Sequence, residues 1–226
     1  MRTRLGGIAF LLAGLLYLLA ETVAAAAWHT PPYNYAVNYI SDLGVAGCGV
    51  EYAGRVLCSP LFAVMNAGFV VDGLLFLTAG VLLAPLLSVR LRVLFVAAVV
   101  LHATGNVLVG LFDETTGALA AGLPRTHVIG ATLAILFGNV AALAGGTWGV
   151  RAGQRVGWIA VLLGTLGIVA LASLAVGGLG LPEGLVERMA VYPITAFEVL
   201  AGVWALRLPV RVRRSGEPAD PPRRVR

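Results

Sequence analysis

Six long apolar runs, separated by short polar segments, constrain this chain more than any other feature. They cover about residues 5–27, 61–87, 91–112, 126–149, 155–177 and 186–208. A helix that crosses a bilayer needs about 20 apolar residues, and each run meets that length. Because lipid satisfies no backbone hydrogen bond, continuous runs of this kind predict helices and not open strands. The chain is therefore predicted to be an all-α, polytopic membrane protein with a six-transmembrane-helix bundle.

The composition agrees with a membrane environment. Hydrophobic residues make up 59% of the chain and charged residues only 12%, whereas soluble domains carry about 25% charged residues. The six runs leave no room for a soluble domain, so residues 1–209 are predicted to form one membrane domain. Residues 210–226 are predicted to be a disordered, basic cytoplasmic tail. The expected location is the cell membrane, as a multi-pass protein with the lipid bilayer as its partner.

The arginines predict the orientation of the spans. Thirteen of the sixteen precede the first run, lie in the second and fourth loops, or follow the last run. The positive-inside rule makes that side cytoplasmic, together with both termini. The same placement accounts for the net charge of +5, so no nucleic-acid partner is expected. A cleaved signal peptide is the alternative interpretation of the first run, but the run is long for one, and a retained helix is preferred.

The loop at residues 28–60 is the longest connection between runs. Its aromatic and apolar content predicts an ordered segment that packs against the helix ends. Cys48 and Cys58 lie in it, and on the outer side of a bacterial membrane they are predicted to form a disulfide, with two free thiols as the alternative. Ser59 and Pro60 are predicted to be the N-cap and the first residue of the second span.

Ionisable side chains inside the apolar runs are rare and mark functional hypotheses. They are Glu21, Asp72, His102 and Glu198, accompanied by Asn66, Asn106 and Asn139. At about 100° per residue, His102, Asn106 and Asp113 share one face of the third span, and Glu187 and Glu198 share one face of the sixth. Both faces are expected to line the bundle interior. The candidate ligand-binding residues are Ser41, Asn66, His102, Asn106, Asn139, Arg188, Tyr192 and Glu198.

A second polar group is expected at the outer boundary of the membrane. Asp42, Asp113, His127 and Glu187 are candidate catalytic residues there. Asp113, His127 and Glu187 would hold a divalent metal and lower the pKa of its water, or Asp113 would orient His127 as a general base. Simpler roles remain open: Glu187 stabilises a helix N-terminus, and Arg188 pairs with Glu187 or a lipid phosphate. The sequence requires no cofactor.

Several of these segments occur together in a known family. They are Asn38–Gly44, Cys58–Pro60 leading to Asn66, Gly110–Glu114, His127–Ala131 with Gly138 and Asn139, and Glu187–Arg188 with Tyr192 and Pro193. The combination resembles the bacterial and archaeal membrane family catalogued as domain of unknown function 998, over roughly residues 5–208. The resemblance implies an integral membrane protein with six spans, and it implies no particular reaction.

Three functional hypotheses follow from these residues. The first is an outward-facing polar pocket that binds or moves a lipid or small molecule. The second is an acid–base or metal-dependent hydrolase or transferase that acts on lipid of the outer leaflet, so enzymatic activity stays open. The third is a structural subunit or homo-oligomer, in which Gly145 and Gly149 permit close approach of a partner helix.

Overall fold

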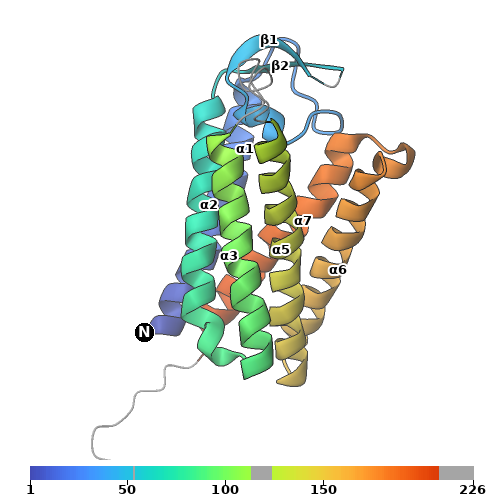
Figure 1. Cartoon of the computed structure of the whole chain (residues 1–226). Helices are drawn as coiled ribbons and strands as arrows, with labels where there is room; N and C mark the ends of the chain where they lie inside the picture. The colour runs from blue at the N-terminus through green and yellow to red at the C-terminus, as the bar shows by residue number, and fades with distance from the viewer. Residues whose placement is uncertain (53, 113–123, 209–226) are drawn as a thin grey trace, which may run out of the picture.

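The computed structural model describes residues 1–52, 54–112 and 124–208. Within them the chain forms six long helices (Figure 1). They are α1 (Arg2–Ala27), α2 (Phe62–Leu83), α3 (Val89–Leu111), α5 (Pro124–Arg151), α6 (Arg155–Ala175) and α7 (Glu183–Arg207). All six are long and apolar enough to cross a membrane. The predicted all-α class and the six predicted helices are confirmed, and the helix ends differ from the predicted runs by a few residues.

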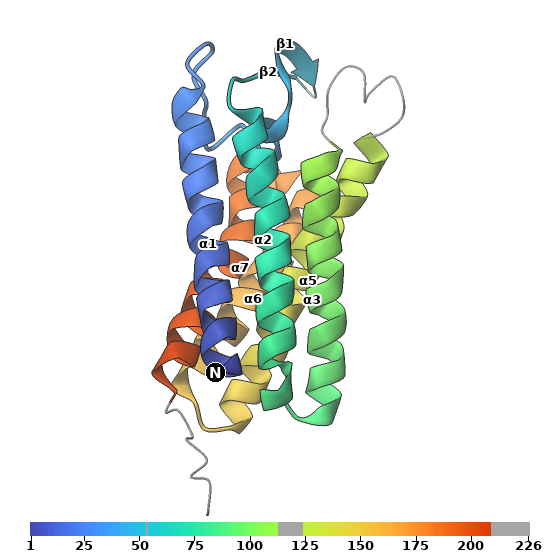
Figure 2. The same ribbon diagram turned by 90° about the vertical axis from the view of Figure 1, so that its left-hand side faces the viewer.

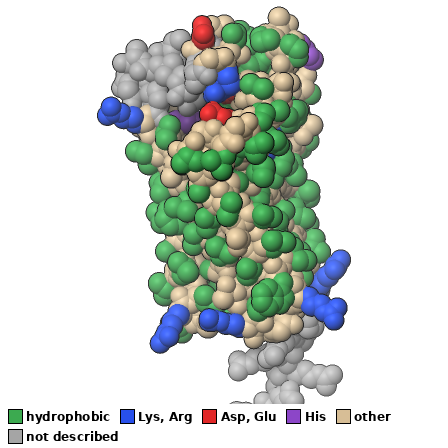
Figure 3. Space-filling view, turned by 90° about the vertical axis from the view of Figure 1, so that its right-hand side faces the viewer, with side chains coloured by type: hydrophobic (Ala, Val, Ile, Leu, Met, Phe, Trp, Pro, Cys, Tyr) green, Lys and Arg blue, Asp and Glu red, His purple; other side chains and the backbone are tan. Residues whose placement is uncertain are grey.

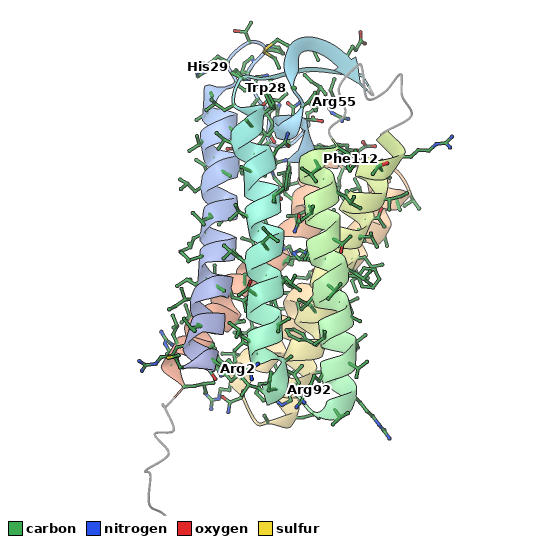
Figure 4. The ribbon with its side chains drawn as sticks, turned by 60° about the vertical axis from the view of Figure 1, so that its left-hand side comes forward. Arg2, Trp28, His29, Arg55, Arg92 and Phe112 are labelled. Carbon is green, nitrogen blue, oxygen red and sulfur yellow. A yellow bond between two sulfur atoms is a disulfide. The ribbon has the colours of Figure 1, made fainter. Side chains whose placement is uncertain are left out.

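The six helices form a closed ring in chain order. Each packs against its neighbours in the sequence, and α7 closes the ring by packing against α1 (Figure 2). Arg2 and Arg92 lie at one end of the bundle, here called the arginine end, whereas Trp28, Arg55 and Phe112 lie at the other (Figure 4). Two short strands cover that second end, which is called the hairpin end. The N-terminus lies at the arginine end, where α7 also finishes.

Two apolar clusters fill the interior. Toward the arginine end, the Phe10 ring packs edge-on against Phe76 and Phe197, with ring centroids 5.0 and 5.6 Å apart. Toward the hairpin end, a second cluster includes Trp28, Leu43, Met65 and Phe69. Asp72, His102 and Glu198, polar residues of the spans, are nonetheless buried among these helices.

Small residues bring several helix backbones into direct contact. A methyl group added at Gly105 of α3 would lie 2.3 Å from the backbone nitrogen of Ala134 in α5. Gly145 and Gly149 also face helices of the same chain: Phe197 of α7 lies opposite Gly145, and Gly157 of α6 lies opposite Gly149. This pair of glycines therefore packs within the monomer. Assembly of several copies remains a prediction that these two residues do not support.

The loop between α1 and α2 is ordered, as predicted, but its strands were not foreseen. It contains a short 3-10 helix, η1 (Ser41–Gly44), and an antiparallel hairpin of β1 (Gly47–Tyr52) and β2 (Arg55–Ser59). The predicted N-cap role of Ser59 is wrong, because Ser59 ends β2 and α2 begins at Phe62. The Ser59 hydroxyl donates a 2.6 Å hydrogen bond to the Leu43 carbonyl, which binds the hairpin to η1.

The predicted disulfide is confirmed. Cys48 and Cys58 are directly paired residues of the two strands and are bonded through their sulfurs. The bridge closes a loop with a sequence separation of 10, and loop-closure entropy for this length corresponds to about 3 kcal/mol. It therefore adds substantially to the stability of a two-stranded hairpin, which is marginal by itself.

Replacement of Cys48 and Cys58 by serine is expected to open the hairpin and leave the six-helix bundle folded. Limited proteolysis should then cut between residues 47 and 59 at least tenfold faster, since about 1.4 kcal/mol of lost local stability changes an opening equilibrium tenfold. Reductant should produce the same cleavage in the unmodified protein and no further change in the variant. Equal cleavage rates in both proteins would contradict a stabilising bridge.

Candidate functional site

A polar cluster lies about halfway along the bundle. Asp72 of α2, His102 and Asn106 of α3, and Glu198 of α7 form it, and their exposed fractions are only 4, 3, 6 and 1%. Asp72 is the eleventh residue of α2, which at 1.5 Å per residue places it roughly 15 Å from the start of that helix. The predicted interior stripes of His102 with Asn106, and of Glu187 with Glu198, are confirmed as buried faces.

Hydrogen bonds fix the orientation of the His102 ring. Its Nδ1 lies 2.7 Å from the carbonyl oxygen of Ala134. A carbonyl can only accept, so Nδ1 carries the proton and donates it, and Nε2 of the neutral ring holds a free electron pair. That Nε2 lies 3.0 Å from Nδ2 of Asn106 and 3.5 Å from Oδ2 of Asp72. Asn106 also donates to the same Asp72 oxygen at 2.8 Å.

Each of the two carboxylates keeps one buried oxygen without a partner. Oδ1 of Asp72 and Oε1 of Glu198 accept no hydrogen bond. One oxygen from each carboxylate and a ring nitrogen of His102 all lie within 4.8 Å of one another. Within the described part of the chain, no arginine forms an ion pair with Asp72 or Glu198. The cluster therefore carries acceptor capacity that the surrounding side chains leave unused.

A small cavity adjoins this cluster. Its volume is about 40 Å³, and since one water needs at least roughly 10–15 Å³ by this measure, it has room for two or three waters. The lining runs from Asp72, His102 and Glu198 up to Ser41 and Glu187 below the hairpin. The cavity thus connects the middle of the bundle to the underside of the outer loop, and it is too small for a lipid chain.

Arg188 holds the outer loop onto the helices. Its Nε and Nη2 lie 3.2 and 3.1 Å from Oε1 of Glu21, which comes from α1. Its Nη1 donates to the carbonyl oxygens of Tyr35, Asn38 and Gly184 at 2.7, 2.8 and 2.9 Å. The pairing predicted with Glu187 is replaced by one with Glu21, because the Glu187 carboxylate accepts from the backbone N–H of Ile40 instead. Arg188 has no donor left for a ligand.

Asp42 has a structural partner of its own. Arg55 of β2 binds it with two parallel hydrogen bonds, Nε to Oδ2 at 2.9 Å and Nη2 to Oδ1 at 3.1 Å. Asn38 and the backbone N–H of Tyr39 also donate to Oδ2, at 3.2 and 2.9 Å. Asp42 is fully buried. These contacts give it the role of holding η1 against the hairpin, and the catalytic role predicted for it stays untested.

His127 and Glu187 line a groove on the flank of the bundle. The groove has a volume of about 310 Å³ and runs between α5 and α6, with Val128, Thr132 and Leu174 among its walls. Ser41 and Glu187 line both this groove and the small inner cavity. Nδ1 of His127 lies 2.8 Å from the Phe112 carbonyl, so the ring presents Nε2 as an acceptor. Asp113, the third predicted metal ligand, lies outside the described residues.

The remaining candidates lie apart from one another. Asn66 donates from Nδ2 to the Gly44 carbonyl at 2.9 Å, and Asn139 joins α5 to α7 through a 2.9 Å bond to the Ala190 carbonyl. The Tyr192 hydroxyl donates to Glu21 at 3.0 Å. Glu21 and Asp72 were absent from the predicted sites, although both stood out as ionisable residues inside a span. Burial inside a span was the signal that could have found them.

Comparison with known proteins identifies a family but no specific function. No curated protein and no solved structure matches the chain. A family model described as "Protein of unknown function (DUF998)" matches residues 11–204, a range that includes α2 to α6, most of α1 and α7, and the polar cluster. With most of its length matched, the chain belongs to the DUF998 family.

Proposed function

We propose that this protein binds a lipid amphiphile of the outer leaflet in the groove between α5 and α6. The observation that carries the proposal is the groove itself, which has an apolar opening on the flank and a polar inner end. Its volume of about 310 Å³ falls at the lower limit of small-molecule sites, which is roughly 300 Å³. Val128 and Ala175 are exposed at its walls, so an acyl chain can enter sideways from the bilayer.

The inner end of the groove favours a headgroup that donates hydrogen bonds. Glu187, the Nε2 atom of His127 and the Ser41 hydroxyl all offer acceptor electron pairs there. Tyr39 contributes its phenol, whose pKa is raised by burial and then by its hydrogen bond to the Glu183 carboxylate, so that it stays protonated. Because the Tyr39 hydroxyl donates its hydrogen to Glu183, acceptors outnumber available donors at this end of the groove, which fits a hydroxyl or ammonium headgroup better than a bare phosphate.

We infer that the hairpin end faces outward and that both termini face the cytoplasm. The flank in Figure 3 is a mainly apolar band with blue side chains at its lower end and mixed charges at its upper end. Reporter fusions are expected to place residue 208 and the N-terminus on the cytoplasmic side and residue 54 outside. A reporter that is active only outside the cell, and is active when fused after residue 208, would overturn this orientation.

The lipid site is tested by native mass spectrometry of protein extracted in mild detergent. Thr132→Trp places a large ring in the mouth of the groove and is expected to reduce bound lipid at least tenfold, the result of losing about 1.4 kcal/mol of affinity. Glu187→Gln, which keeps the shape but replaces one carboxyl oxygen by an amide donor, should change which headgroup is retained. The mass of the bound lipid, or of a cleaved product, distinguishes binding from turnover.

The matched control is Ala196→Trp. Ala196 is an exposed residue of α7 in a different flank groove, of about 630 Å³, whose lining of Leu18, Ile159, Val199 and neighbours is mainly apolar. Tryptophan there adds the same bulk in a groove that neither His127 nor Glu187 lines. If Ala196→Trp and Thr132→Trp release lipid equally, or if neither does, the groove between α5 and α6 is not the binding site.

A further inference from the structure

We infer that Asp72, His102 and Glu198 form a binding site for one divalent transition-metal ion in the middle of the bundle. None of the three metal ligands lines the proposed lipid groove. The cavity beside the metal site and the lipid groove share only the lining residues Ser41, Ala131, Ile135 and Glu187. One imidazole and two carboxylates, drawn from three different helices, supply nitrogen and oxygen ligands of the kinds that zinc binds, and three protein ligands leave one coordination position open.

The hydrogen bond of His102 prepares it as a ligand. A histidine that binds a metal donates its other ring N–H to a carbonyl or carboxylate, which fixes the tautomer and the ring plane. His102 already does so, through Nδ1 and the Ala134 carbonyl at 2.7 Å. Its Nε2 is therefore the acceptor atom of the ring; it accepts from Nδ2 of Asn106 at 3.0 Å and lies 3.5 Å from Oδ2 of Asp72. Gly138 leaves room for this ring, since a methyl group there would lie 2.7 Å from Nδ1.

The two carboxylates supply the second argument. Oδ1 of Asp72 and Oε1 of Glu198 are buried and unpartnered, and an unpaired buried carboxylate costs several kcal/mol. Glu198 and Asp72 hydrogen-bond each other through their carboxyl groups, which requires a proton between them. A divalent cation that displaces this proton would neutralise both carboxylates at once and use the free oxygens.

The geometry permits closure onto one ion. The three candidate ligand atoms lie within 4.8 Å of one another. Zinc–oxygen and zinc–nitrogen bonds of about 2.0–2.2 Å are then reached by side-chain shifts of about 1 Å. The neighbouring cavity of about 40 Å³ has room for the water that would occupy the fourth position. Asn106 bridges two of the ligands, because its Nδ2 lies 2.8 Å from Oδ2 of Asp72 and 3.0 Å from Nε2 of His102, so this amide would have to turn away when the ion binds.

The test uses the full chain, purified without a polyhistidine tag and stripped with a chelator. Zn²⁺ is expected to bind at one ion per chain by equilibrium dialysis and to raise the unfolding temperature. Co²⁺ in the same site should give the visible ligand-field absorption of a four-coordinate ion. Asp72→Asn, His102→Gln and Glu198→Gln should each weaken zinc binding by at least about 100-fold. Loss of a residue that only supports a ligand weakens metal binding by at most about 100-fold, so a larger loss identifies a ligand.

The control is Glu51→Gln, which removes an exposed carboxylate of β1 that belongs to neither the cluster nor the proposed lipid groove. This variant should retain one zinc ion per chain. Because a ligand variant can fail to fold, the cobalt spectrum of the unaltered protein is a second test: no ligand-field bands and no bound zinc overturn the site. The metal site is also overturned if, after chelator treatment, the cluster takes up protons but no metal ion. Loss of lipid from the groove concerns the proposed function alone and does not contradict the metal site.

Discussion

Arg188→Ala is expected to lower the free energy of unfolding by about 3–5 kcal/mol, the cost of leaving one member of a buried ion pair alone. The substitution strands the Glu21 carboxylate, which is 2% exposed. It also removes the N–H donor from the carbonyls of Tyr35, Asn38 and Gly184. Unfolding of the purified protein in mild detergent, followed by near-ultraviolet circular dichroism, measures the change.

Two further variants separate charge from packing. Arg125→Ala removes an arginine that is exposed at the start of α5, and a surface change of this kind is expected to alter stability by less than about 0.5 kcal/mol. The double variant Glu21→Leu with Arg188→Met should recover part of the loss, because no charge is left unpaired. An Arg188→Ala protein as stable as the Arg125→Ala control would show that the outer loop is held by other contacts.

Gly105→Leu is expected to destabilise the bundle by about 3 kcal/mol, the upper part of the range for overpacking. The added side chain meets backbone: the first carbon would lie 2.3 Å from the nitrogen of Ala134 and 2.5 Å from the Gly130 carbonyl oxygen. A helix backbone cannot rotate away as a side chain can, so α3 and α5 must separate. The same shift moves the Ala134 carbonyl away from His102, so zinc affinity should fall as well.

The comparison for this variant is Gly145→Ala on α5. Its nearest neighbour would be Cζ of Phe197 at 3.4 Å, an ordinary contact distance, and alanine favours helix by up to about 1 kcal/mol over glycine. Gly145→Ala should therefore unfold at or slightly above the temperature of the unaltered protein. If Gly105→Leu unfolds at the same temperature as Gly145→Ala, the close approach of α3 and α5 is not a constraint.

Much of the architecture was predictable because lipid imposes a simple rule on the sequence. A run long enough to span must be a helix, so the six apolar runs translated directly into six helices. The hairpin was not predictable in that way. Its strands, β1 and β2, have 6 and 5 residues and depend on pairing and on the disulfide, and periodicity is weak in so short a segment.

The candidate sites were predictable only as faces of helices. His102 with Asn106, and Glu187 with Glu198, were placed correctly in the interior by their spacing. Which helix faces contact each other depends on how the six helices are arranged in the bundle, and the sequence carries no local signal for that arrangement. The partner of Arg188 is accordingly Glu21, 167 residues away, and not the adjacent Glu187. Asp72 joined His102 for the same reason, since α2 and α3 pack side by side.

The pairing of Glu21 with Arg188 has a consequence for biosynthesis. The first spanning helix enters the membrane with a carboxylate whose partner is 167 residues further along the chain. At roughly 5–20 residues per second of synthesis, the nascent protein waits about ten to thirty seconds before that partner emerges. Ribosome-bound chains that stop before α7 should therefore be substrates for membrane quality control, and release of the last helix should be the step that makes them resistant to it.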